Sequence, residues 1–530
     1  MNAPGDARAG RALDVAILGG GLAGNLLARQ LRLALPRLRV GLFEKESARS
    51  FKVGEATVEI ASNYLVRRLG LSTYLYERQL PKNGLRYFFD GPERDHPLER
   101  MSEVGSVSLP FHPAFQLDRA ALEADLLDMN RRDGVQVRTG ARVQGVELGR
   151  GGSPHRVRVE DEAGAREVEA RWVVDASGRV GSLARRQGLR VAEPAHRIGS
   201  VWGRFEGVAD IDAMGPAEFR ERIRYAPRRL STIHFMYRGY WVWFIPLRGG
   251  LVSVGATGEP IARDRELRTR EGFLRFLHGH RAIATLLRDA KLVDLGHLAR
   301  IAYGTRRFFH RDRWGLSGEA ATSADPLYSP GSDFIALEND FLADLIARDA
   351  AGEDREALAE RTALYDAFMQ FRHEATLLLY AGLYGTLGSY ELACAKWDFD
   401  IGFYYNLWAT AYLRDRHLDA EYLRSQLRLR PMVLQALRNF AELFRRVERE
   451  LDRRGDYGRS NSGHFYHGLT NIPFAERVGT ERSESEVMAS TLDLFNRVRA
   501  RAAVLLGEAD SPGAVAPLPM AAFLGRRTVL

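Results

Sequence analysis

A glycine-rich turn near the N-terminus constrains the fold of this chain more than any other feature. The apolar run 14–18 leads directly into Gly-x-Gly-x-x-Gly at residues 19–24, and a helical run follows. In this pattern Gly19 allows a tight turn, Gly21 lets the backbone approach a pyrophosphate, and Gly24 permits close packing of helix on strand. The free N–H groups and the dipole at the start of the helix then favour a bound phosphate.

A second apolar run, residues 38–43, ends at Glu44, about 20 residues beyond the last glycine, where a carboxylate accepts hydrogen bonds from ribose hydroxyls. Strand, glycines, helix, strand and acid in this order predict a dinucleotide-binding unit. We expect its contacts to come from Gly19, Gly21, Leu22, Ala23, Gly24 and Glu44.

The composition excludes several classes of protein. The 530 residues carry a net charge of +8, 45% are hydrophobic and 27% are charged, as in ordinary globular proteins. Apolar runs fall short of the roughly 18–20 residues of a membrane helix, and the first residues lack the apolar segment of a secretory signal. Cys394 is the only cysteine, so an internal disulfide and a multi-cysteine metal site are excluded. We predict a cytoplasmic protein with no metal site, no membrane contact and no nucleic-acid partner.

Arginines recur between residues 414 and 454, with acidic residues interleaved. One interpretation is a solvated helical face, and the other is a docking surface for an acidic partner such as a carrier protein. No oligomeric state is predicted.

The remaining pattern predicts an α/β fold with a helical C-terminal part. A strand over 173–175 ends in small residues, and the region from about 198 to 256 is rich in strands, with Trp241, Trp243 and Ile245 on one face. A helix follows 329–332, capped by Ser332 or Asp333. We expect a dinucleotide-binding domain over 12–350 with an interwoven sheet lobe at about 80–115 and 198–303, helices over 351–506, and a loosely ordered tail over 507–530.

Four segments together resemble the flavin-dependent halogenases that act on phenols, pyrroles and similar electron-rich rings. They are the glycine turn, Val53-Gly54-Glu55-Ala56-Thr57, Lys82 before Asn83-Gly84-Leu85-Arg86, and Trp241-x-Trp243-x-Ile245-Pro246. The resemblance covers roughly residues 13 to 350. It implies an FAD-binding Rossmann-like fold of the aromatic-ring monooxygenase type and a substrate lobe separated from the flavin by a tunnel.

The family's chemistry implies roles for the motif residues. Reduced FAD, O2 and halide (chloride or bromide) give hypohalous acid, and Trp241 and Trp243 exclude the organic substrate from the flavin. Lys82 then receives the oxidant at the far end of the tunnel, as an ammonium that hydrogen-bonds it or as an amine that forms a haloamine. Burial lowers the pKa of a lysine and favours the amine.

The resemblance assigns further residues to the cofactor. We expect Arg49 to meet a phosphate, Glu319 to face the ribityl chain, and the backbone at Asp175 to lie near the adenosine half, with no catalytic role for that carboxylate. The other expected cofactor contacts are Gly54, Glu55, Ala56, Pro330, Gly331 and Ser332.

Two departures from the family pattern bear on the function. Halide is held in the family by backbone N–H groups of the turn 329–332, and Pro330 has none, so Gly331 and Ser332 remain as the halide donors. This leaves open an oxygen-inserting monooxygenase on the same scaffold, or a non-catalytic flavoprotein in a biosynthetic complex. Tyr328 stands where tryptophan halogenases carry a glutamate, which argues against free tryptophan as the substrate.

The expected partners follow from these features. No second glycine fingerprint follows a strand, so we expect a separate flavin reductase to supply reduced FAD. The expected substrate is a small aromatic molecule, free or bound to a carrier protein, in secondary metabolite biosynthesis.

Overall fold

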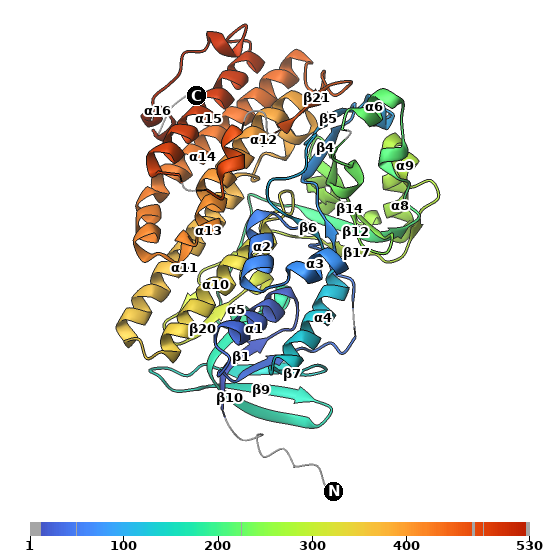
Figure 1. The fold of residues 1–530 in the computed structure, drawn as a ribbon. Coiled ribbons are helices and arrows are strands. Elements are labelled where there is room, and N and C mark those ends of the chain that lie inside the picture. The colour runs from blue at the N-terminus through green and yellow to red at the C-terminus, as the bar shows by residue number, and fades with distance from the viewer. Residues whose placement is uncertain (1–11, 49, 224, 469–471, 481, 526–530) are drawn as a thin grey trace.

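The computed structural model describes residues 12–48, 50–223, 225–468, 472–480 and 482–525. In Figure 1 the chain starts beside the lower sheet, crosses a second sheet on the right of the view, and ends in the orange and red helices at the upper left. The predicted α/β class with a helical C-terminal part is confirmed.

The first sheet is built around β1 (Leu13–Leu18), which pairs in parallel with β2 (Val40–Phe43) and β10 (Gly164–Asp175). β7 (Gln136–Arg138) and β20 (Trp314–Leu316) extend the parallel part on either side, and β19 (Phe309–His310) adds an antiparallel edge. β2 is buried along its whole length, β1 is buried except at Asp14, and the end of β10 that pairs with β1 is largely buried, as expected for a parallel sheet covered by helices. The flanking helices are α1 (Leu22–Ala34), α4 (Arg119–Arg132) and α10 (Pro330–Ala350).

The second sheet has the order β16-β12-β15-β14-β13-β4-β5-β21, in which β16 (Lys291–Leu292), β5 (Ser102–Val104) and β21 (Phe465–Tyr466) are short outer strands. Its centre is formed by β12 (Gly199–Glu206), β15 (Val252–Gly258), β14 (Tyr240–Pro246), β13 (Thr232–Tyr237) and β4 (Leu85–Phe89). Trp241, Trp243 and Ile245 of β14 face the main core, whereas Val242 and Phe244 face a separate core under this sheet. The predicted alternation of β14 is therefore confirmed.

Long helices form the C-terminal part: α11 (Arg355–Leu378), α12 (Tyr390–Tyr404), α14 (Ala420–Arg454) and α15 (Glu484–Leu505). The described part of the tail differs from the expected loose order. It contains α16 (Met520–Leu524), and Phe523 is fully buried against Phe440 and Phe495. The Pro/Gly/Ala-rich composition concealed one large apolar side chain, and burying it holds the tail in place.

Helices long and apolar enough to cross a bilayer are absent from the described ranges.

Candidate functional site

The glycine turn forms a backbone cradle at the carboxyl end of β1. Gly19 has a φ of +111°, and a Cβ there would lie 2.4 Å from the carbonyl oxygen of Ala176. A Cβ at Gly24 would lie 2.0 Å from the carbonyl oxygen of Gly19, so the helix packs too closely for any side chain. Gly21, by contrast, has nothing within 4 Å of its Cβ position and is half-buried. The cradle is thus closed behind and open in front, as a bound pyrophosphate requires.

Glu44 follows β2 directly and lies beside this cradle. Its Oε2 accepts the N–H of Gly20 at 2.6 Å and its Oε1 accepts the N–H of Glu46 at 2.9 Å, which fixes the carboxylate at the rim. No side chain caps α1, so the first N–H groups of the helix stay open to a ligand. These residues fit a dinucleotide.

Asp175 lies deeper, at the end of β10, and is fully buried. One carboxylate oxygen accepts the N–H of Ser177 at 3.0 Å and the other accepts the N–H of Leu183 at 2.7 Å. The side chain therefore holds the turn behind the cradle, while its backbone ends next to Leu18 of β1.

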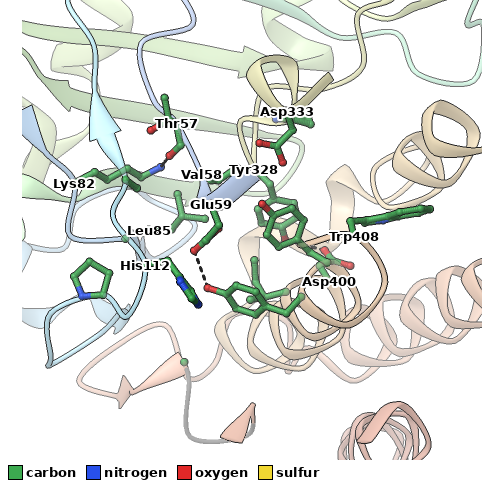
Figure 2. Close-up of a pocket in the computed structure, with 18 of the residues that line it drawn as sticks. Thr57, Val58, Glu59, Lys82, Leu85, His112, Tyr328, Asp333, Asp400 and Trp408 are labelled. Atoms are coloured by element: carbon green, nitrogen blue, oxygen red, sulfur yellow. Dashed lines mark hydrogen bonds between the residues drawn. The ribbon is translucent and has the colours of Figure 1, made fainter. Parts of the chain in front are cut away.

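A large pocket lies at the junction of the first sheet's domain with the C-terminal helices. It encloses about 1150 Å³ of atom-free space, its open mouth included. Its walls come from residues 57–59, from the loop at 82–85, from residues 106–114, and from α10, α11 and α12. Figure 2 shows side chains of these distant segments pointing toward one another.

Lys82 lies in this pocket on the loop between β3 (Leu80–Pro81) and β4. Its backbone N–H donates to the carbonyl of Ala114 at 2.8 Å, and its Nζ donates to the carbonyl of Thr57, also at 2.8 Å (Figure 2). The side chain is 2% exposed. Burial lowers the pKa of Lys82 to about 8, against the opposing field of Glu59 and Asp333. A buried amino group that titrates close to neutral pH thus faces the pocket, an arrangement typical of functional lysines.

Two acids of the pocket, the half-buried Glu59 and the buried Asp400, bind tyrosine hydroxyl groups. Glu59 accepts the hydroxyl of Tyr405 at 2.8 Å, and Asp400 accepts the hydroxyl of Tyr328, also at 2.8 Å (Figure 2). Lys396 forms an ion pair with Asp400 from one helical turn away. Burial raises the pKa of Tyr328 above its ordinary value, so the group remains a neutral hydroxyl.

The helical wall contains the residues that the sequence analysis missed: Glu59, Arg372, Asp400, Tyr404, Tyr405 and Trp408. Tyr405 and Trp408 belong to η9 (Tyr405–Ala409), a single π-helical turn that continues α12. Such turns are frequent at functional sites because they shift side chains out of the α-helical register. The aromatic and acidic residues at 397–408 carry no motif, since their meeting with Lys82 depends on the tertiary fold.

Trp241 and Trp243 lie on β14, outside the residues that line the pocket. The indole of Trp241 donates to the hydroxyl of Tyr384 at 3.1 Å and lies 5.2 Å from the ring of His234. The indole of Trp243 packs against Gly255, where a Cβ would lie 2.2 Å from a ring carbon. Both side chains are rigidly buried.

The turn at 54–56 contacts the second sheet. Gly54 has a φ of +98°, and Ala56 bridges to Gln116. The carboxylate of Glu55 is fully buried and pairs with Arg204 at 2.9 Å. This ion pair fixes the turn to β12, and the Glu55 side chain does not reach the pocket.

Helix α10 begins earlier than the sequence analysis expected. Ser329, with a φ of +54°, is the N-cap and Pro330 is the first helical residue, so Ser332 and Asp333 lie inside the first turn. The expected cap at Ser332 or Asp333 is wrong, because proline at the first helical position marks this start. Pro330 lines the pocket, and the N–H groups of Gly331 and Ser332 belong to the first turn, where no carbonyl of the helix accepts them.

One further expected residue, Glu319, lies apart from the pocket. Glu319 is on η7 (Gly318–Ala320), and its half-exposed carboxylate pairs with Arg179 at 2.9 Å. Arg49 falls outside the described residues.

Comparison with known proteins decides the family. The family model described as "FAD binding domain" matches residues 12–325, more than half of the chain. This chain belongs to the FAD-binding domain family. The family match confirms the predicted FAD cofactor, and the cradle formed by the glycine turn has the open front that this cofactor requires.

Its relatives confirm the resemblance to flavin-dependent halogenases. The chain is 29% identical over 365 residues to "Flavin-dependent halogenase chlA" of Dictyostelium discoideum, covering 63% of this chain and 60% of that protein. It is 29% identical over 368 residues to a "1H-pyrrole-2-carbonyl-[peptidyl-carrier protein] chlorinase" of Pseudomonas fluorescens, covering 65% and 76%. The match thus spans about three fifths of the length of the Dictyostelium relative.

The solved structures agree in fold over nearly the whole chain. A crystal structure of halogenase PltM superposes with a TM-score of 0.65 at 18% identity, covering 93% of this chain and 97% of that one. The chondrochloren halogenase CndH superposes with a TM-score of 0.55 at 24% identity over 69% of this chain and 83% of that one. The C-terminal helices therefore belong to the shared architecture of PltM.

Proposed function

We propose that this protein is a halogenase that uses FAD to place a halogen on an electron-rich aromatic ring. The observation that carries the proposal is the burial of the Lys82 amino group in the wall of a large pocket. Pro330, the first residue of α10, lines the same pocket, and α10 packs along α1 of the FAD cradle. One helix thus connects the place where the cofactor binds to the pocket that takes the substrate.

Reduced FAD, O2 and halide supply hypohalous acid to this site. Lys82 then holds the oxidant through its ammonium, which predominates below pH 8. One of its N–H groups donates to the Thr57 carbonyl, and an ammonium has three donors, so two remain for the oxidant. The backbone N–H groups of Gly331 and Ser332 are our candidates for the halide, and Trp241 and Trp243 for the wall that excludes the substrate from the flavin.

The substrate is an aromatic molecule such as a phenol or a pyrrole, free or carried on a protein, and its reduced FAD comes from a separate reductase. The chlorinase of Pseudomonas fluorescens is named for a pyrrole on a carrier protein, which supports the carrier-bound form. The pocket supports an aromatic guest, because Tyr380, Trp397, Tyr404 and Trp408 line it.

A product assay tests the proposal. The purified protein is incubated with FAD, NADH, an independent flavin reductase and a panel of phenols and carrier-bound pyrroles, in chloride or in bromide. A halide-dependent mass increase of one halogen in place of hydrogen supports the proposal. A gain of oxygen supports the monooxygenase alternative. That alternative is favoured by Pro330, which has no N–H group to donate to a halide. Binding of an aromatic guest with no product supports the non-catalytic alternative.

The reductase is tested in the same mixture. Without the added reductase we expect no product and no consumption of NADH above the rate without protein. Rapid NADH oxidation by the purified protein alone would contradict this part of the proposal.

A further inference from the structure

Two buried charged side chains line the pocket without pairing with each other. Asp333 lies in the first turn of α10 and Arg372 lies on α11, and they are 1% and 3% exposed. Neither was part of the expected site. No N–O contact of 4.0 Å or less joins them, although both belong to the described residues.

The two oxygens of Asp333 are satisfied unequally. Its Oδ1 accepts the N–H of Ala61 at 3.0 Å. Its Oδ2 accepts no hydrogen bond of ordinary geometry within the described part of the chain, although the Tyr404 hydroxyl lies near enough to lower the pKa of the carboxyl. Figure 2 shows the carboxylate of Asp333 near Tyr328, on the other side of Glu59 from Lys82. A buried carboxylate oxygen without a donor is costly, so it requires an explanation.

The guanidinium of Arg372 likewise has a donor without a partner. Its Nη1 donates to the Thr376 hydroxyl at 3.0 Å, and its guanidinium lies 4.4 Å from the ring centroid of Trp408. Its Nε has no hydrogen-bond partner, and no carboxylate of the described residues forms an ion pair with the group. A guanidinium buried in this way is poised for an anion or for an oxygen acceptor.

A phenol hydroxyl satisfies both groups at once. It carries one proton to donate to Asp333 Oδ2, and its oxygen accepts from Arg372. A pyrrole ring has an N–H to donate but no oxygen lone pair for the guanidinium, so the ring alone satisfies only the carboxylate, and a carrier-bound pyrrole would need its carbonyl oxygen for Arg372.

We propose that Asp333 and Arg372 bind the hydroxyl of a phenolic substrate, with Asp333 taking its proton and Arg372 stabilising the phenolate. The chemistry of this step rests on the proposed function, while the binding of the phenol does not. Asp333 is then a catalytic residue and Arg372 a binding residue, and the substrate class narrows to phenols.

The step balances as follows. The phenol O–H bond breaks and its proton moves to Asp333 Oδ2. The electron pair of the phenolate oxygen flows into the ring, and a ring carbon ortho or para to it attacks the halogen of hypohalous acid held at Lys82. A carbon–halogen bond forms and the oxygen–halogen bond breaks, leaving hydroxide. Loss of the ring proton restores aromaticity, and that proton with the hydroxide gives water. The ring is oxidised by two electrons and the halogen is reduced.

The surroundings of Asp333 suit a base that works near neutral pH. Burial raises the pKa of the Asp333 carboxyl to about 7, and the negative charge of Glu59, the first residue of α2 (Glu59–Asn63), raises this pKa as well. Arg372 on α11, the N–H of Ala61 and the hydroxyl of Tyr404 act in the opposite direction. The negative charge of Asp333 in turn raises the pKa of Lys82, against the effect of burial. A general base is most effective when its pKa lies near the working pH.

A binding experiment tests the proposal without any turnover. A nitrophenol is titrated into the FAD-loaded protein at a pH below the pKa of the free ligand, and the visible absorption of the phenolate is recorded. We expect the bound ligand to show the phenolate band. The variants Asp333→Asn and Arg372→Gln should bind the neutral form or bind more weakly by at least about tenfold, which corresponds to ~1.4 kcal/mol.

Matched controls come from the same helix. Asp344→Asn and Arg348→Gln alter a carboxylate and a guanidinium of α10 that lie outside the pocket, where Asp344 accepts from Arg348 and Tyr365. Both should keep the phenolate band. Asp333→Glu keeps the carboxylate, and it carries the test if Asp333→Asn fails to fold, as judged by its melting temperature.

Turnover then separates this inference from the proposed function. Asp333→Asn should lose about 10²-fold in halogenation of weakly acidic phenols, and much less with acidic phenols that ionise without help. Formation of hypohalous acid, measured with a chemical trap, should stay unchanged. A phenolate band with no halogenated product would contradict the proposed function alone. A neutral bound ligand in the wild-type protein, or a band that survives in both variants, would overturn the phenol site.

Discussion

The FAD cradle and the substrate pocket are built on different principles. The cradle is made of backbone from one continuous segment of six residues. Two of its three glycines, Gly19 and Gly24, pack too closely against backbone for a side chain, and the third, Gly21, leaves the front open. The pocket is made of side chains from segments far apart in the sequence, such as Glu59 and Tyr405, which share a hydrogen bond although 346 positions separate them. The first kind of site can be read from a local pattern, and the second appears only when the chain has folded.

Substitution of the cradle glycines should give the largest effects. In Gly24→Val the new Cβ would lie 2.0 Å from the Gly19 carbonyl oxygen. Overpacking of this kind costs about 1–3 kcal/mol; because the strain falls on the phosphate turn, we expect FAD affinity to fall by about 100-fold. Flavin fluorescence titration and thermal unfolding measure the two changes.

Gly21→Ala is the matched control within the same turn. Nothing lies within 4 Å of its Cβ position and its φ is −74°, so the melting temperature without FAD should stay unchanged while FAD affinity falls. Equal destabilisation by both variants would remove the distinction between the closed back and the open front of the cradle.

Loss of Phe523 should weaken the other region. This ring packs on Phe440 of α14 and Phe495 of α15, behind the helix that lines the pocket. Phe523→Ala should lower the free energy of unfolding by about 3–5 kcal/mol, as for other buried phenylalanines, with FAD affinity unchanged. Denaturant unfolding checks this, with the exposed Ala521→Ser as control. An unchanged free energy of unfolding in Phe523→Ala would instead support the loosely ordered tail that the sequence analysis expects.

The pH dependence of the pocket should follow Lys82. The lowered pKa of about 8 means that the ammonium is lost as pH rises through that value. If the ammonium holds the oxidant, the yield of halogenated product per flavin reoxidised should fall about tenfold per pH unit above 8. A yield that instead rises through pH 8 would identify the amine, and hence a haloamine, as the active form.

The smallest effect is expected at Glu319. Its half-exposed pair with Arg179 is worth about 0–1 kcal/mol, so Glu319→Gln should change FAD affinity less than about fivefold. A larger loss, measured by flavin fluorescence, would place the carboxylate on the ribityl chain, as the family resemblance implies.

The same contrast explains which features could be predicted from the sequence. The glycine turn and the alternation of Trp241, Trp243 and Ile245 follow from local geometry and are found in the structure. Glu44 lies beside the turn, and its contact with a ribose stays a prediction. Lys82 was found by its motif and is buried in the pocket, while its catalytic role stays a prediction. Asp333, Arg372 and Tyr405 escaped notice because an acid, an arginine and a tyrosine on helices are ordinary until tertiary packing directs them into one pocket. Phe523 escaped for the same reason, whereas Pro330 did signal the start of α10.

The most direct test of the account is a comparison of Lys82→Met with the wild-type protein in one assay. Reduced FAD, O2, bromide and a phenol are supplied, and flavin reoxidation, trapped hypohalous acid and brominated product are measured together. Because Lys82 lies in the pocket and outside the FAD cradle, the variant should reoxidise flavin and release hypohalous acid normally while its brominated product falls to background. An unchanged yield of brominated product from Lys82→Met would contradict the account.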